Sequence, residues 1–213
     1  EVAELVSGEP CVNHNYERLH AFNLWFVVAG PDAKAVADTI ARIEARTGLA
    51  VLDLPLVEAY HIDLGFSLAG GRHRRAAVPR ADYRPDPLDR DLLAAIEDGL
   101  PIVPRPYHEV AEKVGIPEET LLDRLLRLTA SGIVPRFGCV VRHRALGYTA
   151  NAMAVWDVPD GRIGEIAAHF ARSPKVTLCY RRPRRLPDWR YNLFCMIHAK
   201  TQSDVYAAID DLN

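Results

Sequence analysis

The sequence lacks several features that would place it in a class of protein at once. Its longest apolar runs, such as Leu24–Gly30, are far shorter than the roughly 20 residues that a membrane-spanning helix needs. It contains 26 lysine and arginine residues against 28 aspartate and glutamate residues, a formal net charge of −2. A chain without a basic excess is a poor candidate for a dedicated nucleic-acid-binding protein. We therefore expect neither a membrane nor a nucleic acid as its partner.

Motifs for metals, nucleotides and secretion are also missing. The four cysteines, Cys11, Cys139, Cys179 and Cys195, form no CxxC pair, and no His/Cys/Asp spacing fits a zinc site. Neither a GxGxxG motif nor a P-loop occurs, and Ser67 lacks the context of a nucleophile elbow. Nothing resembles a signal peptide, so we expect reduced thiols in a cytoplasmic protein. With 213 residues, of which 49% are hydrophobic, the chain can form one large or two small globular domains.

What the sequence does contain is an internal repeat. Residues 12–18 align with 176–182 at an offset of 164, and residues 23–25 align with 192–194 at an offset of 169. The second copy therefore carries five additional residues (169 − 164) in the loop after its Tyr-x-Arg segment. A repeat of this length indicates two copies of one structural unit.

The two copies are incomplete in complementary ways. The first begins at Glu1 within a helical pattern and has no counterpart of about 85–164. The second stops at Asn213 and has no counterpart of 45–66. We therefore expect this chain to be part of a longer protein of two units. A single decayed duplication is the alternative.

The stretch between the copies has the pattern of a winged helix-turn-helix. Apolar residues at helical spacing predict a helix over 87–97, a short helix around 110–115 that ends at glycine, and a third over 117–130. Residues 133–141 are typical of a strand or hairpin, the wing of such a domain. The Gly-, Arg- and Pro-rich stretch before the first of these helices indicates a linker.

The remaining elements follow the order β-α-β-β-α-β of a ferredoxin-like domain. The second copy predicts the first five, and the first copy supplies the last strand: 150–158, 161–172, 176–180, 191–198, 202–212 and 56–66. We therefore predict an α+β protein with two tandem units, both partial. The expected domains are a partial ferredoxin-like domain, a linker, a winged helix-turn-helix, and a ferredoxin-like domain without its last strand: 1–69, 70–86, 87–148 and 149–213.

The predicted recognition helix has the wrong charge for DNA. It carries Glu118, Glu119 and Asp123 against Arg124 and Arg127, a net charge of −1. A helix that contacts base edges usually presents Arg, Lys, Asn or Gln in its first turn. The helix-turn-helix is therefore better interpreted as a structural or dimerising module.

Positive charge gathers instead in the loop after residue 180. Five arginines occur within eleven residues between Tyr180 and Arg190. Arginine holds carboxylates and phosphates through two parallel hydrogen bonds, so this loop suits a small polyanion. Tyr180, Arg182, Arg184 and Arg185 are the candidate binding residues. The alternative is a solvated loop or a contact between subunits.

The first copy places histidines at the equivalent position. His14 and Tyr16 lie two residues apart on a predicted strand and so share a face, whereas the second copy has Leu178 in place of His14. His61 lies on the last predicted strand of the same sheet, so we expect His14 and His61 to face one cavity. Imidazole is a suitable proton donor near neutral pH. For either histidine alone, a structural or surface role is an equal alternative.

Eight segments of the sequence are distinctive: 136–138, 141–148, 151–159, 179–183, 189–194, 196–198, 13–18 and 60–65. Together with the winged helix and the β-α-β-β-α-β order, they resemble the AsnC/Lrp family, and within it the siroheme decarboxylases of heme d1 and alternative heme biosynthesis. The resemblance covers nearly the whole chain and looks like a fusion of two subunit types that are separate chains elsewhere in the family.

The resemblance implies a reaction. The C12 and C18 acetates of siroheme would lose CO2 and become methyl groups, and no cofactor is needed beyond the substrate, because the macrocycle delocalises charge. His14, His61 and Tyr16 would be catalytic. Arg18, His20, His143, Tyr180 and the three loop arginines would bind the substrate's carboxylates. No metal site is expected apart from the iron of the substrate.

The resemblance also implies assembly, as a homo-oligomer or as a heteromer of the two subunit types, through the ferredoxin-like sheets. Two other functions remain open at this point. One is a transcriptional regulator of the AsnC/Lrp type that senses an amino acid or a tetrapyrrole. The other is a non-catalytic heme-binding scaffold.

Overall fold

The computed structural model describes residues 1–62, 83–134, 137 and 147–213. The chain divides into two compact units, one made of residues 1–64 and 150–213 and the other of residues 65–149. Most of the predicted linker and wing, and His143 with them, lie outside the described residues. The two units are described separately below.

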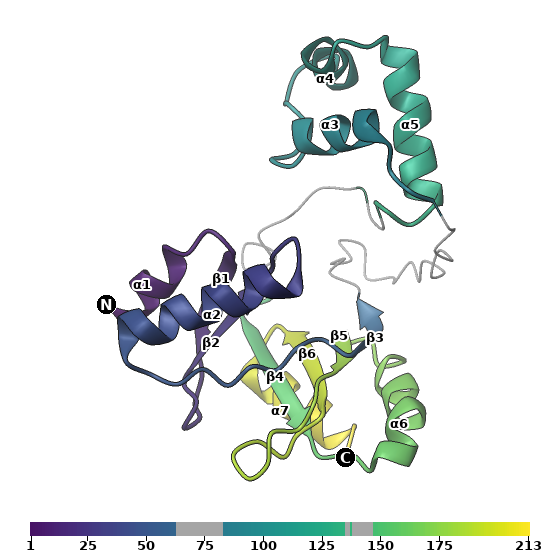
Figure 1. The fold of residues 1–213 in the computed structure, drawn as a ribbon. Helices are drawn as coiled ribbons and strands as arrows, with labels where there is room; N and C mark the ends of the chain where they lie inside the picture. The colour runs from purple at the N-terminus through teal and green to yellow at the C-terminus, as the bar shows by residue number, and fades with distance from the viewer. Residues whose placement is uncertain (63–82, 135–136, 138–146) are drawn as a thin grey trace. The chain divides into compact units, whose positions relative to one another are not determined.

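The first copy of the repeat forms a hairpin with two helices. Strands β1 (Val12–Glu17) and β2 (Leu24–Val28) pair antiparallel, with α1 (Val2–Ser7) before them and α2 (Ala33–Thr47) after them (Figure 1). Helix α2 begins where the Asp32 side chain accepts a hydrogen bond from the backbone N–H of Ala35 at 2.8 Å. It ends at Gly48, whose φ of 69° is left-handed and therefore favours glycine.

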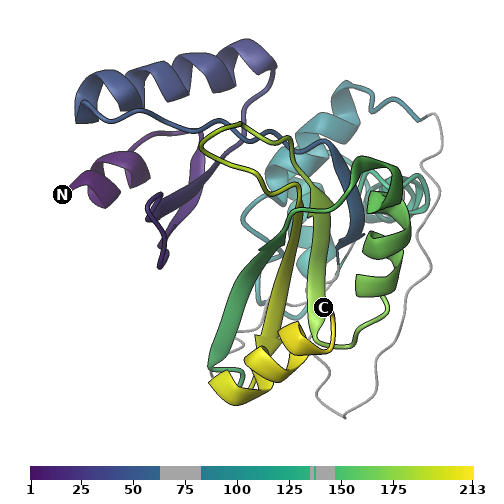
Figure 2. The ribbon, with the colours of Figure 1, turned by 90° about the horizontal axis from the view of Figure 1, so that it is seen from below.

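The second copy forms most of a ferredoxin-like layer. Its elements in chain order are β4 (Ala150–Trp156), the 3₁₀ turn η2 (Asp160–Arg162), α6 (Ile163–Phe170), β5 (Val176–Arg181), β6 (Leu193–Ala199) and α7 (Gln202–Asp210). Both helices cover one face of the sheet, as Figure 2 shows. Cys179, Leu193 and Cys195 point toward them and are fully buried in the core. The opposite face of the sheet is free of these helices.

The structure confirms the repeat at the level of single residues. Adding 164 to the bounds of β1 gives 176–181, which are the bounds of β5. Adding 169 to the first residue of α2 gives 202, the first residue of α7. The two copies therefore have the same order of elements over this part of the chain.

One strand lies where the sequence did not place it. Strand β3 (Glu58–Ile62) belongs to the first copy, and we expected it in the same sheet as β1. Instead it pairs antiparallel with β5 of the second copy, and the four-stranded sheet has the order β3-β5-β6-β4. The first copy's last strand thus completes an edge of the second copy's sheet.

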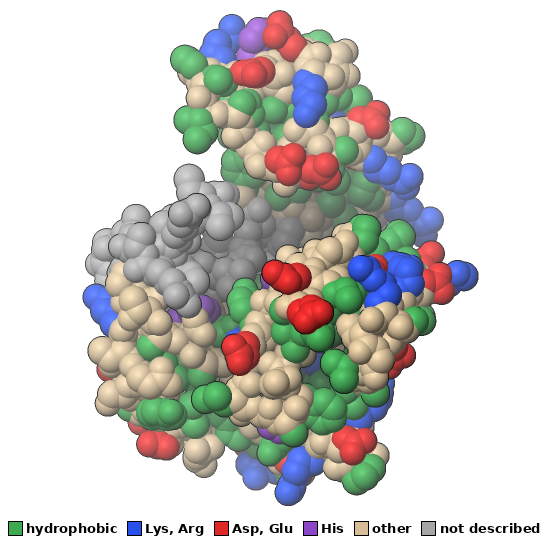
Figure 3. All heavy atoms as spheres, turned by 90° about the vertical axis from the view of Figure 1, so that its left-hand side faces the viewer, with side chains coloured by type: hydrophobic (Ala, Val, Ile, Leu, Met, Phe, Trp, Pro, Cys, Tyr) green, Lys and Arg blue, Asp and Glu red, His purple; other side chains and the backbone are tan. Residues whose placement is uncertain are grey.

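The other unit contains the three predicted helices of the helix-turn-helix. They are α3 (Pro87–Ala95), α4 (Pro106–Val114) and α5 (Glu118–Ala130). Leu92, Leu121 and Leu128 are fully buried between them. On the face that Figure 3 shows, acidic and basic side chains of this unit are interspersed with apolar ones.

A buried ion pair fastens α5 to the start of α3. Arg124 donates to the carboxylates of Asp86 and Asp89, at 2.7 and 2.8 Å, and Asp89 is completely buried. Asp86 and Asp89 also form a capping box at the start of α3. Arg124, one of two arginines of the predicted recognition helix, is therefore engaged within the unit.

Candidate active site

Three polar residues form a row along β1 and the position directly after it. His14 and Tyr16 have ring centroids 5.1 Å apart, and the guanidinium carbon of Arg18 lies 4.8 Å from the centre of the Tyr16 ring. Asn15, between them, points the other way and donates to the Ala3 carbonyl and the Ser7 hydroxyl of α1. The prediction that His14 and Tyr16 share a face is confirmed, and that face is turned away from α1.

The second copy repeats this arrangement. In the first copy Arg18 stacks on Tyr16 and lies 6.0 Å from the Trp25 ring. In the second copy, Arg182 stacks on Tyr180 at 5.0 Å and lies 5.9 Å from the Phe194 ring. These are the same positions under the repeat, because 16 and 18 plus 164 give 180 and 182, and 25 plus 169 gives 194. Each copy therefore carries one unit of tyrosine, arginine and a further aromatic ring, which we call an Arg–Tyr unit.

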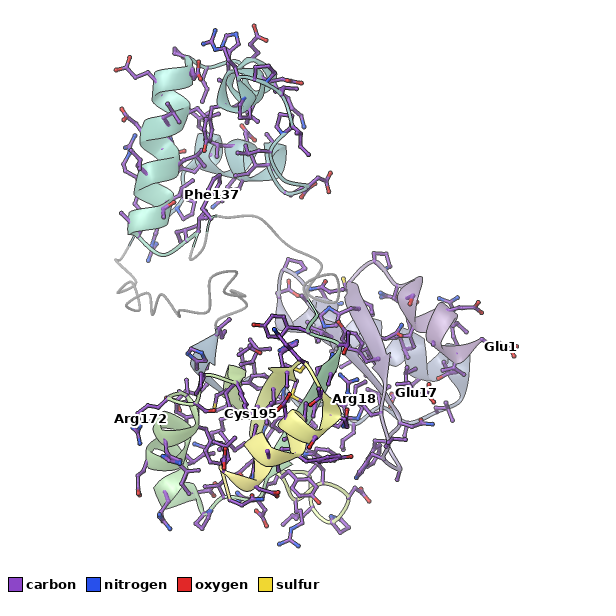
Figure 4. All side chains as sticks on the ribbon, turned by 180° about the vertical axis from the view of Figure 1, so that it is seen from behind. Glu1, Glu17, Arg18, Phe137, Arg172 and Cys195 are labelled. Atoms are coloured by element: carbon purple, nitrogen blue, oxygen red, sulfur yellow. The ribbon has the colours of Figure 1, made fainter. Side chains whose placement is uncertain are left out.

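The two Arg–Tyr units meet. Trp25 and Phe194 have centroids 6.2 Å apart, and Trp189 packs edge-on against Trp25 at 5.5 Å. Arg18 interacts electrostatically with Tyr180 of the other copy as well as with its own Tyr16. Figure 4 labels Arg18 at the end of the hairpin. The helix-free faces of the two copies thus contribute to one site.

Arg18 is a half-buried charge without a carboxylate. Burial lowers the pKa of its guanidinium below the usual value, and its Nε is buried with no hydrogen-bond partner in the described chain. Its Nη1 donates to the carbonyl of Glu17 at 3.1 Å. No aspartate or glutamate of residues 1–62, 83–134, 137 or 147–213 forms a salt bridge with it. An unpaired, partly desolvated cation of this kind is a ready-made site for an anion.

Tyr180 offers a second donor beside it. Burial raises the pKa of its phenol, and the nearby Arg182 and Arg18 oppose that shift. Its hydroxyl donates to the sulfur of Met153 at 3.5 Å, and thioether sulfur is a weak acceptor. At the pH of a cell Tyr180 is therefore a neutral donor that a stronger acceptor would attract.

The arginine-rich loop is largely neutralised by its own chain. Arg184 donates to Asp157 and Asp160, each at 2.8 Å, and Arg190 donates to the other oxygen of Asp157 at 2.8 Å. Arg184 and Arg190 in turn lower the pKa of Asp157. A shallow hollow beside this network is lined by Asp157, Arg184, Leu186, Pro187 and Arg190. We predicted that Arg184 binds substrate, but its guanidinium is already bound to the carboxylates of Asp157 and Asp160.

Arg182 and Arg185 contact the segment that leads into β3. Arg182 donates to the carbonyl of Leu54, and Arg185 donates to the carbonyl of Asp53 at 3.1 Å. The backbone N–H of Val57 also bonds to the carbonyl of Arg181 at 3.0 Å. These two arginines, also predicted to bind substrate, connect the two copies.

The structure does not bring His61 to His14. His61 lies opposite Cys179 in the register of β3 and β5, and opposite residues share a face. The Cys179 side chain is in the core beneath the helices, with its sulfur 3.9 Å from the Ala167 carbonyl of α6. His14 lies in the two-stranded sheet, so the expectation of one shared sheet is wrong.

His20 lies near the site. Its Nδ1 accepts a hydrogen bond from the backbone N–H of Phe22 at 3.0 Å, and its ring packs edge-on against Trp189 at 5.2 Å. The His20 side chain is exposed to solvent. His143, the remaining candidate, lies outside the described residues.

The sequence interpretation missed the aromatic residues between the copies. Trp25 and Phe194 could have been found, because the repeat makes them equivalent to each other and places them beside the arginines. Trp189 lies in the longer loop of the second copy and in one of the segments that carry the family resemblance, yet nothing in the sequence placed it beside the arginines. Only 2% of its surface is exposed. These rings give the site an apolar wall beside its polar donors.

Two other kinds of site receive no support. No group of three or more His, Cys, Asp or Glu side chains in the described ranges has the geometry to hold a metal ion. Among the same residues, no helix combines the length and apolar character needed to cross a membrane.

Comparisons with family models give two matches. Residues 1–61 and 145–213 match the AsnC-like ligand binding domain. Residues 89–134 match the siroheme decarboxylase NirDL-like HTH domain. The first match thus combines both copies of the repeat, and the second covers the three helices of the other unit.

The chain is similar to several siroheme decarboxylases. It is 45% identical to the siroheme decarboxylase NirDL subunit of Paracoccus denitrificans (strain Pd 1222), over 96% of this chain and 63% of that protein. It is 34% identical to the siroheme decarboxylase of Hydrogenobacter thermophilus, over 96% of this chain and 62% of that protein. The chain therefore spans just under two thirds of the length of these relatives.

A solved structure of siroheme decarboxylase NirDL superimposes with a TM-score of 0.67 and 31% identity, over 99% of this chain and 61% of that one. A second structure of the same enzyme, in complex with an iron-uroporphyrin III analogue, gives a TM-score of 0.66.

Proposed function

Because the chain belongs to the family of AsnC-like ligand-binding domains, and its helix-turn-helix is of the siroheme decarboxylase type, we propose that it decarboxylates siroheme. Siroheme is a flat iron tetrapyrrole whose rim carries many carboxylates. A site for it needs an apolar wall for the macrocycle and cationic or hydrogen-bonding groups for the rim. The aromatic rings and the unpaired Arg18 meet both needs.

The observation that carries this proposal is that two hydrogen-bond donors, Arg18 of the first copy and Tyr180 of the second, interact electrostatically. One is a partly buried cation whose Nε has no partner in the described chain, and the other is a hydroxyl bound to a thioether. A carboxylate placed between them would accept from both and neutralise the charge. The hydrogen bonds from Arg18 and Tyr180 would offset its desolvation cost.

The proposed chemistry uses the row along β1. As the bond between the acetate's methylene carbon and its carboxyl carbon breaks, CO2 leaves and the electron pair stays on the methylene carbon, where the pyrrole ring delocalises it. His14 would then protonate that carbon to give a methyl group, while Tyr16, against the His14 ring, would orient the imidazole. Arg18 and Tyr180 would anchor a carboxylate that does not react. Binding energy from the rim would thereby hold the reacting acetate in place.

The proposal extends to the details that the family resemblance implied. The acetates at C12 and C18 would be the two that react, with no cofactor other than the substrate. His61 is left out of the proposed site, because it lies on β3 opposite Cys179, whose side chain is in the core beneath the helices. His20 would contact the rim from beside Trp189.

We also propose assembly with further subunits. Relatives that match 57% of this chain are named as single subunits, such as the siroheme decarboxylase NirL subunit of Stutzerimonas stutzeri and the NirH subunit of Paracoccus pantotrophus. Contacts through the ferredoxin-like sheets would join equivalent chains. Mass measurement of the native protein tests this directly.

The activity is tested by incubating the protein with siroheme in the absence of oxygen and following the pigment by mass spectrometry. We expect the successive loss of two molecules of CO2, and NMR of the product would identify the two positions. Unchanged pigment that stays bound would show a scaffold instead of an enzyme.

A further inference from the structure

The two Arg–Tyr units are alike in geometry but differ in what the arginine contacts. Arg18 and Arg182 stack on their tyrosines at 4.8 and 5.0 Å, and they lie 6.0 and 5.9 Å from the next aromatic ring. The Nη1 of Arg182 donates to the carbonyl of Leu54, from the other copy. The Nη1 of Arg18 donates to the carbonyl of the residue directly before it, which is a local contact. The same side chain is therefore used for a long-range contact in one copy and not in the other.

The segment over Arg182 is fixed at several points. We call residues 53–57 the strap. Arg182 and Arg185 bind the carbonyls of Leu54 and Asp53, and the Val57 N–H bonds to the Arg181 carbonyl. The strap continues directly into β3, which pairs along β5 from Glu58 onward. Displacing the strap would therefore require breaking these hydrogen bonds and disturbing the pairing of β3 with β5.

The main-chain carbonyl of Leu54 accepts a hydrogen bond from Arg182 where a ligand carboxylate could otherwise bind. Both present oxygen acceptors that a guanidinium can bind, but the carbonyl brings no charge and is part of the chain. The strap thus gives Arg182 an acceptor that is always present. In the described chain, Arg18 has no equivalent acceptor from a distant segment.

We propose that the strap closes Arg182 to ligands, so that the chain binds a tetrapyrrole carboxylate at Arg18 and not at Arg182, while Arg182 anchors the segment that leads into β3. This inference rests on the proposed function in taking a tetrapyrrole as the ligand. It divides two equivalent arginines into a binding residue and a positioning residue. Of the two equivalent arginines, Arg18 is then available to a ligand, and Arg182 holds the strap in place.

The test uses iron uroporphyrin III, a carboxylate-rich tetrapyrrole, as the probe. Absorbance titration of the full chain should saturate at one equivalent per chain. Arg18→Gln should weaken binding by roughly tenfold to a hundredfold, the size expected for losing a charge-assisted bond. The melting temperature of Arg18→Gln without ligand should equal or exceed that of the parent, since an unpaired buried charge is removed.

The matched variant is Arg182→Gln, at the equivalent position of the other copy. It should lower the melting temperature without ligand, while the rise in melting temperature on adding the probe should persist. If Arg182→Gln does not fold, Arg182→Lys, which keeps a donor for the Leu54 carbonyl, should fold and bind the probe like the parent. The stoichiometry of the parent and the loss of affinity in Arg18→Gln do not depend on either variant.

Two results would overturn the proposal. One is saturation at two equivalents per chain. The other is an Arg182 variant that loses affinity for the probe as Arg18→Gln does, with its melting temperature unchanged. Because this titration measures binding without turnover, a protein that binds one probe at Arg18 but releases no CO2 would refute the proposed activity and leave this inference intact.

Discussion

Trp25 and Phe194 are equivalent residues of the two copies, and they contact each other with ring centroids 6.2 Å apart. Each also lies about 6 Å from the arginine of its own copy, 6.0 Å for Trp25 and 5.9 Å for Phe194. Contact between equivalent positions is what an approximate two-fold axis between the copies produces. The site therefore depends on how the two copies pack, as well as on the residues within each.

Trp25→Ala should destabilise the protein by about 1–3 kcal/mol, because it removes a ring that packs on Trp189 and Phe194 from the other copy. Denaturant unfolding measures the change. Tyr206→Ala, which removes an exposed ring from α7, is the control and should change stability by less than about 0.5 kcal/mol. Equal effects of the two substitutions would show that the packing between the copies contributes little.

The fold could be read from the sequence where the information is local or repeated. Helix α5 and strand β5 follow from apolar spacing and from the alignment of 12–18 with 176–182. The partner of β3 could not be predicted, because strand pairing is decided by contacts between residues more than 100 positions apart. The sequence of a strand shows which side chains lie on each of its two faces. It does not show which other strand it pairs with.

The same reasoning applies to the site. The number of arginines identified the charged loop, but it did not identify the groups to which these arginines are hydrogen-bonded. The aspartates that bind Arg184 lie 24 and 27 residues before it, and the acceptor of Arg182 is 128 residues away. The row of His14, Tyr16 and Arg18 was predictable, because alternation along a single strand decides which side chains share a face.

The ion pair in the helix-turn-helix should make that unit sensitive to acid. Burial alone would raise the pKa of Asp89, but hydrogen bonds from Tyr83 and Arg124 bring it below its ordinary 3.8. A lowered pKa in the folded state stabilises the fold at pH values above the unfolded pKa, and this is lost as pH falls through the folded value. The protection factors of amides in α3 and α5, which compare their exchange with the intrinsic rate at the same pH, should therefore fall below about pH 4.

Arg124→Gln should speed the same exchange at neutral pH, because it leaves the buried Asp89 carboxylate without its cation. Arg127→Gln, one turn's length along the same helix and exposed, is the control and should exchange like the parent. An Arg124 variant as well protected as the control would show that the ion pair is not what joins α5 to α3.

The helix-turn-helix should not act as a DNA reader. The first turn of α5 presents Glu118 and Glu119, and Arg124 is bound to Asp86 and Asp89. We expect no binding to duplex DNA tighter than about 10 μM at physiological salt, with or without siroheme. Fluorescence anisotropy with labelled promoter fragments measures this. Salt-dependent, sequence-selective binding in the nanomolar range would favour a regulator of the AsnC/Lrp type.

His14→Ala should lower kcat by about a hundredfold or more, because it removes the proposed proton donor, while the KM for siroheme should change little. His169→Ala, at an exposed histidine of α6 away from the row, should have neither effect. His61→Ala is a second comparison, and it should reduce kcat far less than His14→Ala. A His14 variant with full turnover would remove the imidazole from the mechanism.

The most direct measurement is CO2 release from siroheme by the parent protein and by Arg18→Gln under anaerobic conditions. We predict two CO2 per siroheme with the parent, and a raised KM with the variant because its rim carboxylate loses Arg18. A parent protein that binds siroheme but releases no CO2 would contradict the central claim.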